Sequence, residues 1–145
     1  MTKQLYLVAV DGSEWGERAA RHAAFMAKQT GAAVKLITVI PWSGFQPMTL
    51  DEMAHRPLEK AEEERHAKED VLKPLVEKYA ADGVAIDTEF HWGDPVDVIR
   101  KRVKDLHVNQ VFIGRRGRSR ISDLLLGSVA NKLAHVIGIP IVLVP

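Results

Sequence analysis

The chain alternates between short apolar runs and longer segments whose apolar residues recur at helical spacing. Most of the runs are nearly continuous, as expected of strands that are covered on both faces of a sheet. The runs predict five strands, over residues 5–10, 34–40, 84–92, 110–113 and 139–144. The segments between them predict helices over residues 14–30, 58–81, 95–107 and 127–136.

Three of the predicted helices have recognisable ends. Ser13 is suited to cap the first helix, and Gly31 is suited to end it. Asp94-Pro95 predicts the start of the third helix, with a capping carboxylate followed by proline at the first helical position. Gly138 follows the last helix and ends it.

The middle of the chain is less regular. Residues 41–57 contain three prolines and are predicted to form a long loop with at most a short helical turn. Pro74 lies inside the charged segment 58–81, where a missing N–H predicts a kink or a division of the helix.

Strands that alternate with helices predict an α/β fold with an open parallel sheet and helices on both faces. We expect one Rossmann-like domain over residues 1–145, with the five strands in the order 3-2-1-4-5. In such sheets ligands bind beyond the carboxyl ends of the strands, where the strand order reverses. The loops after Val10, Ile40, Trp92 and Ile113 are therefore the places to look for a site.

Composition narrows the classes of function. The chain has 145 residues and a net charge of +1, which argues against a bulk binder of nucleic acid. It has no cysteine, so disulfides, thiolate nucleophiles and cysteine-held metal sites are excluded. No apolar run approaches the ~20 residues that span a bilayer, and the N-terminus has no signal-peptide pattern. We expect a cytoplasmic protein without membrane insertion.

The small net charge conceals two segments of opposite sign. Residues 51–70 hold eight acidic and four basic side chains, a local balance of −4. Residues 100–120 hold eight basic side chains and one acidic, a local balance of +7. The second segment includes a glycine-containing loop, which predicts one small polyanionic ligand.

Two of the loops at strand ends carry glycine in a suggestive pattern. Asp11-Gly12-Ser13 follows the first strand, and Gly114-x-x-Gly117, nine residues and Gly127-Ser128 follow the fourth. Glycine allows a close backbone approach, and a helix N-terminus offers free N–H groups to phosphate. A polyphosphate cradle is one interpretation, and an ordinary turn with an ordinary helix cap is the other. Neither G-x-x-x-x-G-K-[ST] nor G-x-G-x-x-G occurs.

With these segments the sequence resembles the universal stress protein family over the whole chain. The likeness rests on the Val10–Ser13 opening, the Gly93–Pro95 helix start, the long glycine motif and the Pro140–Val144 ending. In that family G-x-x-G-x9-G-[ST] marks the branch that binds ATP. The resemblance therefore implies an adenine nucleotide (ATP, ADP or AMP), with Mg²⁺.

The resemblance also implies roles for individual positions. Asp11 would lie near the ribose or the bound metal, and the backbone of Val39 would meet the adenine edge. Ala9, which stands where many members carry proline, would line the cleft with Ile113. The ribose and phosphates would be held by Gly114, Gly117, Gly127, Ser128 and Val129.

The glycine loop is rich in arginine, which suits phosphate oxygens. Arg116 and Arg118 are predicted phosphate contacts, and a solvated basic loop is the alternative. The six histidines do not pair at His-x-x-x-His spacing on one helix, which argues against a zinc site. Asp11 could bind Mg²⁺ through the phosphates of the nucleotide, because hard cations take carboxylate and phosphate oxygens. No catalytic residue stands out, and we expect slow ATP hydrolysis at most.

Three functions remain open at this point. The first is a nucleotide-dependent regulator in the stress response, which family resemblance implies would be a homodimer through Ile141–Val144, or a tetramer. The second is a protein-interaction module, for example a regulator of a transporter or metabolic enzyme, that does not need nucleotide. Its docking surface would be the second helix and the loop after Ile40. The third, a phosphate- or adenylate-transferring enzyme, has the least support in the sequence.

Overall fold

The computed structural model describes residues 3–41, 49–117 and 126–145. Its centre is a five-stranded parallel sheet in the order β3-β2-β1-β4-β5. The strands are β1 (Leu5–Ala9), β2 (Ala33–Pro41), β3 (Ile86–Gly93), β4 (Gln110–Gly114) and β5 (Ile141–Val144). The predicted fold class and strand order are confirmed.

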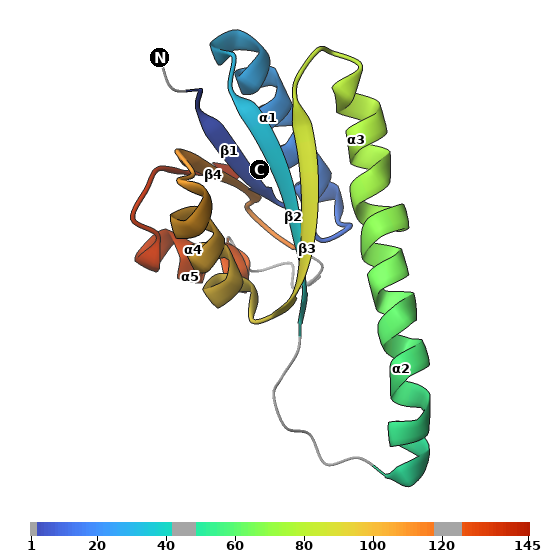
Figure 1. Cartoon of the computed structure of the whole chain (residues 1–145). Helices are drawn as coiled ribbons and strands as arrows, with labels where there is room; N and C mark the ends of the chain where they lie inside the picture. The colour runs from blue at the N-terminus through green and yellow to red at the C-terminus, as the bar shows by residue number, and fades with distance from the viewer. Residues whose placement is uncertain (1–2, 42–48, 118–125) are drawn as a thin grey trace.

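Helices cover both faces of the sheet (Figure 1). One face packs against α1 (Glu14–Thr30), a π-helical segment η1 (His66–Leu72) and α3 (Lys73–Ala80). The other packs against α4 (Pro95–Leu106) and α5 (Ser128–Val136). Alternate residues of β1 enter the two cores: Tyr6 and Val8 pack on the α1 side and Leu7 on the α4 side. No helix in the described ranges is long and apolar enough to cross a membrane.

The predicted helix ends are also present. The Ser13 hydroxyl accepts a hydrogen bond from the Gly16 N–H at 3.2 Å, which caps α1. Gly31 ends α1 with φ of 77°, a left-handed conformation that glycine adopts without strain. Asp94 accepts from the Asp97 N–H at 3.0 Å and caps α4.

The prediction of a loop up to residue 57 is wrong for its last part. The helix α2 (Leu50–Arg65) begins at Leu50, because Thr49 and Glu52 form a capping box. The Glu52 N–H donates to the Thr49 hydroxyl and the Thr49 N–H donates to the Glu52 carboxylate, both at 3.2 Å. Pro57 lies inside the helix. The N–H that it lacks would have met the carbonyl of the exposed residue Met53, which water can reach instead.

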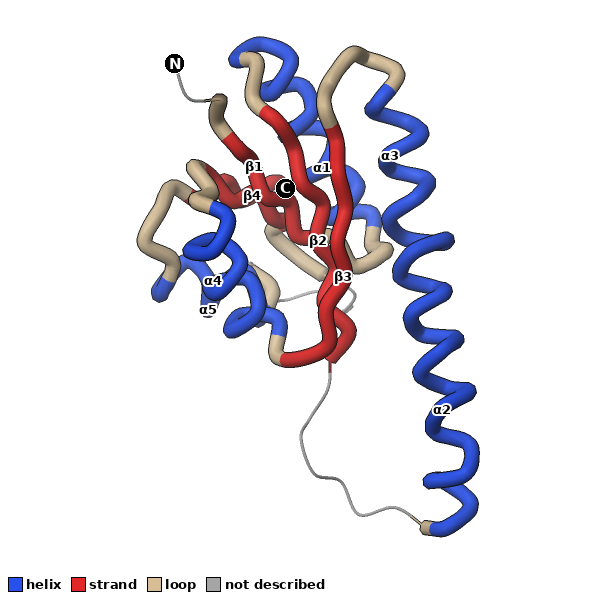
Figure 2. The backbone as a smooth tube through the Cα atoms, in the orientation of Figure 1, coloured by secondary structure: helices blue, strands red, loops and turns tan. Residues whose placement is uncertain are grey.

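The division predicted at Pro74 takes the form of a change in helix type. The helices α2 and α3 are joined by η1, and the three form one long rod in Figure 2. The Lys73 N–H donates to the Lys68 carbonyl, five residues back, just before Pro74. The wider π-helical turn accommodates the N–H that Pro74 lacks. It also buries Ala67, Val71 and Leu72.

Candidate functional site

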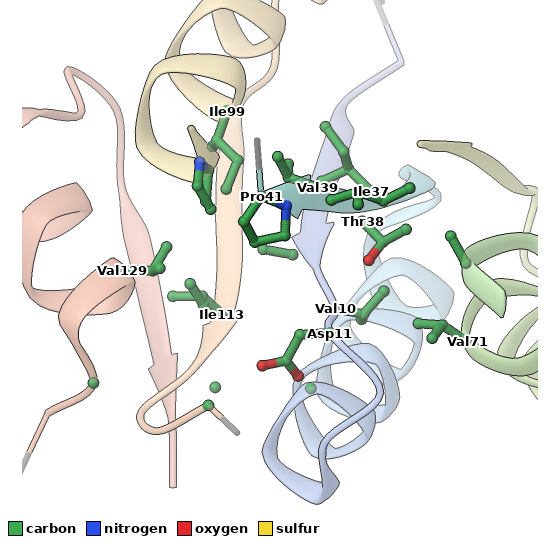
Figure 3. Close-up of a pocket in the computed structure, with 18 of the residues that line it drawn as sticks. Val10, Asp11, Ile37, Thr38, Val39, Pro41, Val71, Ile99, Ile113 and Val129 are labelled. Atoms are coloured by element: carbon green, nitrogen blue, oxygen red, sulfur yellow. The ribbon is translucent and has the colours of Figure 1, made fainter. Parts of the chain in front are cut away.

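A pocket of about 670 Å³ lies at the carboxyl ends of the strands. It is built on β1, β2 and β4, which includes the point where the chain crosses from one side of β1 to the other. Figure 3 shows Ile113 and Val129 on one side of the pocket, Val71 on the opposite side, and Asp11 between them. This is the position at which open parallel sheets bind ligands.

Asp11 is held in place by the turn that follows β1. Its Oδ1 accepts a hydrogen bond from the Ser13 N–H at 3.0 Å. Gly12 has φ of 84°, so the tight turn needs the left-handed conformation there. With the carboxylate tied to the turn on one side, its position at the pocket is fixed before any ligand arrives.

The glycine positions of the long motif leave no room for a side chain, because other residues pack closely against them. Gly114, Gly117 and Gly127 are not among the residues with positive φ. A Cβ on Gly114 would lie 2.6 Å from the Cβ of Trp15, and one on Gly117 would lie 3.0 Å from Asp11 Oδ2. These glycines therefore bring the motif against the first turn of α1 and against the Asp11 carboxylate.

The two halves of the motif meet in the structure. The Gly127 N–H donates to the Arg115 carbonyl at 2.7 Å, which joins the start of α5 to the end of β4. A Cβ on Gly127 would lie 3.4 Å from both the Arg116 Cα and the Gly117 nitrogen. The Arg115 N–H donates to the Val144 carbonyl at 2.7 Å and anchors the junction to β5.

This junction presents hydrogen-bond donors to the pocket. Gly127 is the N-cap of α5 and has no side chain to satisfy the first turn. The first-turn residues Ser128, Val129 and Ala130 line the pocket. Arg116 lines it too, and its Nε is buried without a hydrogen-bond partner in the described part of the chain. A buried donor of this kind is costly unless a ligand meets it, and a helix N-terminus favours an anion.

The opposite part of the pocket is apolar. Ile37, Val39 and Pro41 come from β2, and Ile99 comes from α4 (Figure 3). The site therefore combines a donor-rich end with an apolar end on rigid strands. Such a combination suits a ligand that has a phosphate at one end and a planar ring at the other.

A further wall comes from α2 and η1 and includes Glu62, Glu63 and His66. A hydrogen bond from Arg65 holds the pKa of Glu62 below its ordinary value. His66 Nδ1 lies 2.9 Å from Asp70 Oδ2. This wall adds negative charge to one rim of the pocket.

Trp92 fastens this wall to the sheet. Its Nε1 donates to Glu64 Oε1 at 3.0 Å, and the cations of Lys60 and Arg56 lie 5.6 and 5.9 Å from its ring centroid. The three α2 residues are four apart in sequence and so share one helix face. Neighbouring His91 bonds Glu89 at 3.0 Å and does not line the pocket.

Ten of the eleven predicted site residues line this one pocket: Ala9, Asp11, Val39, Ile113, Gly114, Arg116, Gly117, Gly127, Ser128 and Val129. Arg118 lies outside the described residues. Sequence reasoning missed the wall from α2 and η1 and the contribution of Pro95 and Ile99. The predicted helix start after Trp92 could have indicated Pro95 as a site residue. No local sequence pattern indicated the wall from α2 and η1.

Comparison with known proteins agrees with this architecture. The sequence profile of the universal stress protein family matches residues 6–145. The chain belongs to the universal stress protein family. Universal stress protein YxiE of Bacillus subtilis (strain 168) is 30% identical over 142 residues, covering 95% of this chain and 96% of YxiE.

Solved structures of universal stress proteins share the fold. The protein UspA from Lactobacillus plantarum has a TM-score of 0.86 at 20% identity, with full coverage of both chains. A universal stress protein in complex with cAMP has a TM-score of 0.65 at 21% identity, covering 100% of this chain and 98% of the other. An Archaeoglobus fulgidus universal stress protein in complex with dAMP has a TM-score of 0.66 at 19% identity, covering 99% and 98%.

The described residues contain no group of three histidine or acidic side chains that converges on a metal position. A cation at this site of the universal stress protein would therefore depend on oxygen atoms from a ligand. Asp11 is a carboxylate at the pocket that could complete such a set, because hard cations take carboxylate and phosphate oxygens.

Proposed function

We propose that this universal stress protein binds ATP, or a related adenine nucleotide, in the pocket at the carboxyl ends of β1, β2 and β4. The observation that carries the proposal is the donor-rich junction: the uncapped first turn of α5 and the side chain of Arg116 line the same cavity. The complexes of two family members with cAMP and dAMP support the class of ligand.

Each part of the nucleotide would be bound by residues of matching chemistry. Arg116, Ser128 and the first-turn amides of α5 would meet phosphate oxygens, because they are donors at a helix N-terminus. The apolar end would take the adenine ring, with the Val39 backbone at the ring edge. Asp11 would meet the ribose, or a Mg²⁺ ion that the phosphates bring with them.

The arrangement suits retention of a nucleotide better than rapid turnover. Asp11 already accepts a backbone hydrogen bond, which orients it as a binding group. Fast hydrolysis needs a positioned water and a clamp on the developing charge. We propose a regulator whose bound nucleotide changes how it associates with other proteins, with ATP hydrolysis that is slow at most.

The first experiment identifies what the purified protein retains. Protein prepared without added nucleotide is denatured, and the released small molecules are identified by mass spectrometry. Calorimetric titration with ATP, with and without Mg²⁺, then gives the affinity. A protein that releases no adenine nucleotide and binds no ATP in either titration contradicts the proposal.

Substitution of Gly117 tests the site directly. A Cβ at this position lies 3.0 Å from Asp11 Oδ2, so Gly117→Val fills the space between the motif and the carboxylate. We expect loss of ATP binding with little change in the thermal midpoint. Gly138→Val is the matched control, because an added Cβ there meets nothing within 4 Å. Equal ATP affinity in the two variants would contradict the assignment.

The proposed dimer uses the free edge of β5 at Ile141–Val144. This strand pairs only with β4 among the described strands, and Leu143 is 37% exposed. An edge strand that is apolar and short needs cover, and a second copy would supply it. If the protein is instead an interaction module, its partner is captured equally well with and without ATP.

A further inference from the structure

The outer edge of β3 carries backbone groups that no described strand pairs with. β3 is the last strand on its side of the sheet, as Figure 2 shows, and among the described strands it pairs only with β2. Val34 of β2 is level with Ile86, and its N–H donates to the Ala85 carbonyl at 2.9 Å. Bonding alternates along a parallel pair, so the odd-numbered residues of 85–93 bond to β2. The N–H and C=O groups of the even-numbered residues therefore point outward.

One outward group of this edge is already bonded, and those beside it are open. The Thr88 N–H donates to Asp87 Oδ1 at 2.8 Å, so it is not available to another strand. The Thr88 carbonyl and both backbone groups of Phe90 have no hydrogen-bond partner among the described residues. An edge with open backbone groups is a template on which a further strand can pair.

A groove of about 560 Å³ lies beside this open part of the edge. Thr88 and Phe90 line it from β3, and Leu72 and Val76 line it from η1 and α3. Leu72 is buried in the core on the α1 side of the sheet, and Phe90 and Val76 pack against that core. The side chains of a strand added beside β3 would alternate between the two faces of the sheet. Those on the α3 side would enter this groove.

The groove also carries positive charge. Lys68 and Lys73 line it, and both are exposed. The Lys68 Nζ lies 5.0 Å from the centroid of the Phe90 ring, and Lys68 has no ion pair in the described part of the chain. Lys73 has an acidic neighbour in Glu69, at 3.4 Å, but an exposed pair of this kind is weak. Glu89 lines the groove as well, but α4 binds its carboxylate from the other face.

We propose that the edge of β3 binds an extended acidic segment of another protein as an added strand of the sheet. The backbone of that segment would bond to the Thr88 carbonyl and to both groups of Phe90. One apolar side chain would enter the groove between β3 and α3. Acidic side chains two residues before and after it would reach Lys68 and Lys73, since every second side chain of a strand points to the same face. Backbone bonds would supply affinity and the side chains specificity.

A second copy of this chain is a poorer occupant of the edge. An antiparallel pair of β3 strands would bring Lys68 and Lys73 of both copies to one face of the joined sheet, where like charges repel. The edge is also at the opposite end of the sheet from β5. Binding there does not require nucleotide, so its failure would leave the nucleotide proposal intact.

A synthetic peptide tests the chemistry of the occupant. The probe is the end-blocked, fluorescein-labelled peptide Thr-Glu-Thr-Leu-Thr-Glu-Thr, whose glutamates and leucine share one face when it is extended. Its binding to the full chain is followed by fluorescence anisotropy. We expect saturable binding, and binding about tenfold weaker or less for the same peptide with lysine in place of both glutamates.

Charge reversal in the protein is the matched test. We expect Lys68→Glu/Lys73→Glu to weaken binding of the glutamate peptide by about tenfold and to bind the lysine peptide instead. Lys101→Glu/Lys104→Glu is the control, because both lysines are exposed but lie on α4, which covers the other face. This control should bind both peptides as the natural protein does.

Amide hydrogen exchange, resolved by residue with NMR, tests the backbone bonds. The Phe90 N–H points outward, whereas those of Glu89 and His91 already bond to β2. We expect a saturating amount of the glutamate peptide to slow exchange at Phe90 and to leave Glu89 and His91 unchanged.

The proposal is supported by slower exchange at Phe90 together with the exchanged peptide preference of Lys68→Glu/Lys73→Glu. It is overturned by the absence of saturable binding, by equal affinity for the two peptides, or by binding that leaves exchange at Phe90 unchanged. Protection of Phe90 that appears without peptide as the protein is concentrated overturns it too, because a second copy would then be the occupant.

Discussion

At the scale of single residues, Arg116 is the side chain with the most unusual surroundings in the site. It lines the pocket, and its Nε is buried without a partner in the described chain. Removing a guanidinium donor from water costs free energy, and a hydrogen bond to a phosphate oxygen would offset that cost. Under the proposed function, this donor would bind a phosphate oxygen of the nucleotide.

Replacing Arg116 should therefore weaken nucleotide binding more than it affects folding. A hydrogen bond to a charged group contributes about 1.5–3 kcal/mol, so Arg116→Gln should lower ATP affinity by about 10–150-fold. Arg116→Lys should recover part of this loss, since it keeps the charge but not the planar fork. Arg100→Gln, on the exposed side of α4, is the control in the same titration. Unchanged affinity in Arg116→Gln would remove this residue from the site.

Glu89 illustrates a residue that stabilises the fold away from the site. Its carboxylate receives Arg102 Nε at 2.7 Å and an Arg102 terminal nitrogen at 3.0 Å, and His91 lies 3.0 Å away. Burial alone would raise the pKa of Glu89, but the hydrogen bonds from Arg102 and His91 outweigh it and lower the pKa. The carboxylate is therefore charged in the folded protein at all ordinary pH values.

Glu89→Gln should lower the free energy of unfolding by about 1–3 kcal/mol at neutral pH, because it leaves Arg102 poorly paired. A lowered folded pKa means that the contribution is complete above the unfolded pKa of about 4.3 and is lost as the pH falls through the folded value. The difference between the two proteins in thermal midpoint should shrink below about pH 4. Asp82→Asn is the control, since Asp82 is exposed and makes no salt bridge of this kind among the described residues. A difference that stays constant down to pH 3 would contradict this assignment.

At the scale of elements, the helices with a buried face were predicted, whereas residues 50–57 of the exposed helix α2 were not. The first helix has five alanines that are buried against the sheet, and its cap and stop residues are where the sequence indicates. Residues 50–57 of α2 have no buried side chain to give a periodic signal, and Pro57 argues for a loop. The Thr49-x-x-Glu52 pattern was present in the sequence and would have placed the helix start. The π-helical segment has no comparable sequence signal.

This contrast predicts different effects for two similar cap substitutions. Loss of a capping hydroxyl costs about 0.5–2 kcal/mol of helix stability. In Ser13→Ala this should lower the global unfolding free energy, because α1 is part of the core. In Thr49→Ala it should only fray the start of α2, because residues 50–55 are all exposed. Thermal unfolding reports the first effect, and amide hydrogen exchange in residues 50–55 reports the second. A global loss in Thr49→Ala as large as that in Ser13→Ala would show instead that the start of α2 is coupled to the core.

At the scale of the whole molecule, the part of the site at the strand ends could be predicted from the sequence. The outer wall could not, because tertiary contacts form it. The glycine motif and the Asp11 turn are local patterns, and the parallel topology brings them together. The wall from α2 and η1 is held by the buried residues of η1 and by the bond between Trp92 and Glu64, which are 28 residues apart. A long-range contact of this kind has no periodic or spacing signal in one sequence. Together with the contacts of Arg56 and Lys60 to the Trp92 ring, this bond holds residues 56–66 against β3 as one unit.

Removing the ring of Trp92 should loosen this unit without unfolding the sheet. Trp92→Leu deletes both the hydrogen bond to Glu64 and the stacking with Lys60 and Arg56, whereas Trp92→Phe deletes only the hydrogen bond. We expect faster amide exchange over residues 56–66 in both proteins and a larger effect in Trp92→Leu. ATP affinity should fall in the same order, because Glu62, Glu63 and His66 would no longer be held at the pocket rim. If Trp92→Leu exchanges over this segment at the natural rate, then η1 alone positions the wall, and Trp92 has no part in shaping the site.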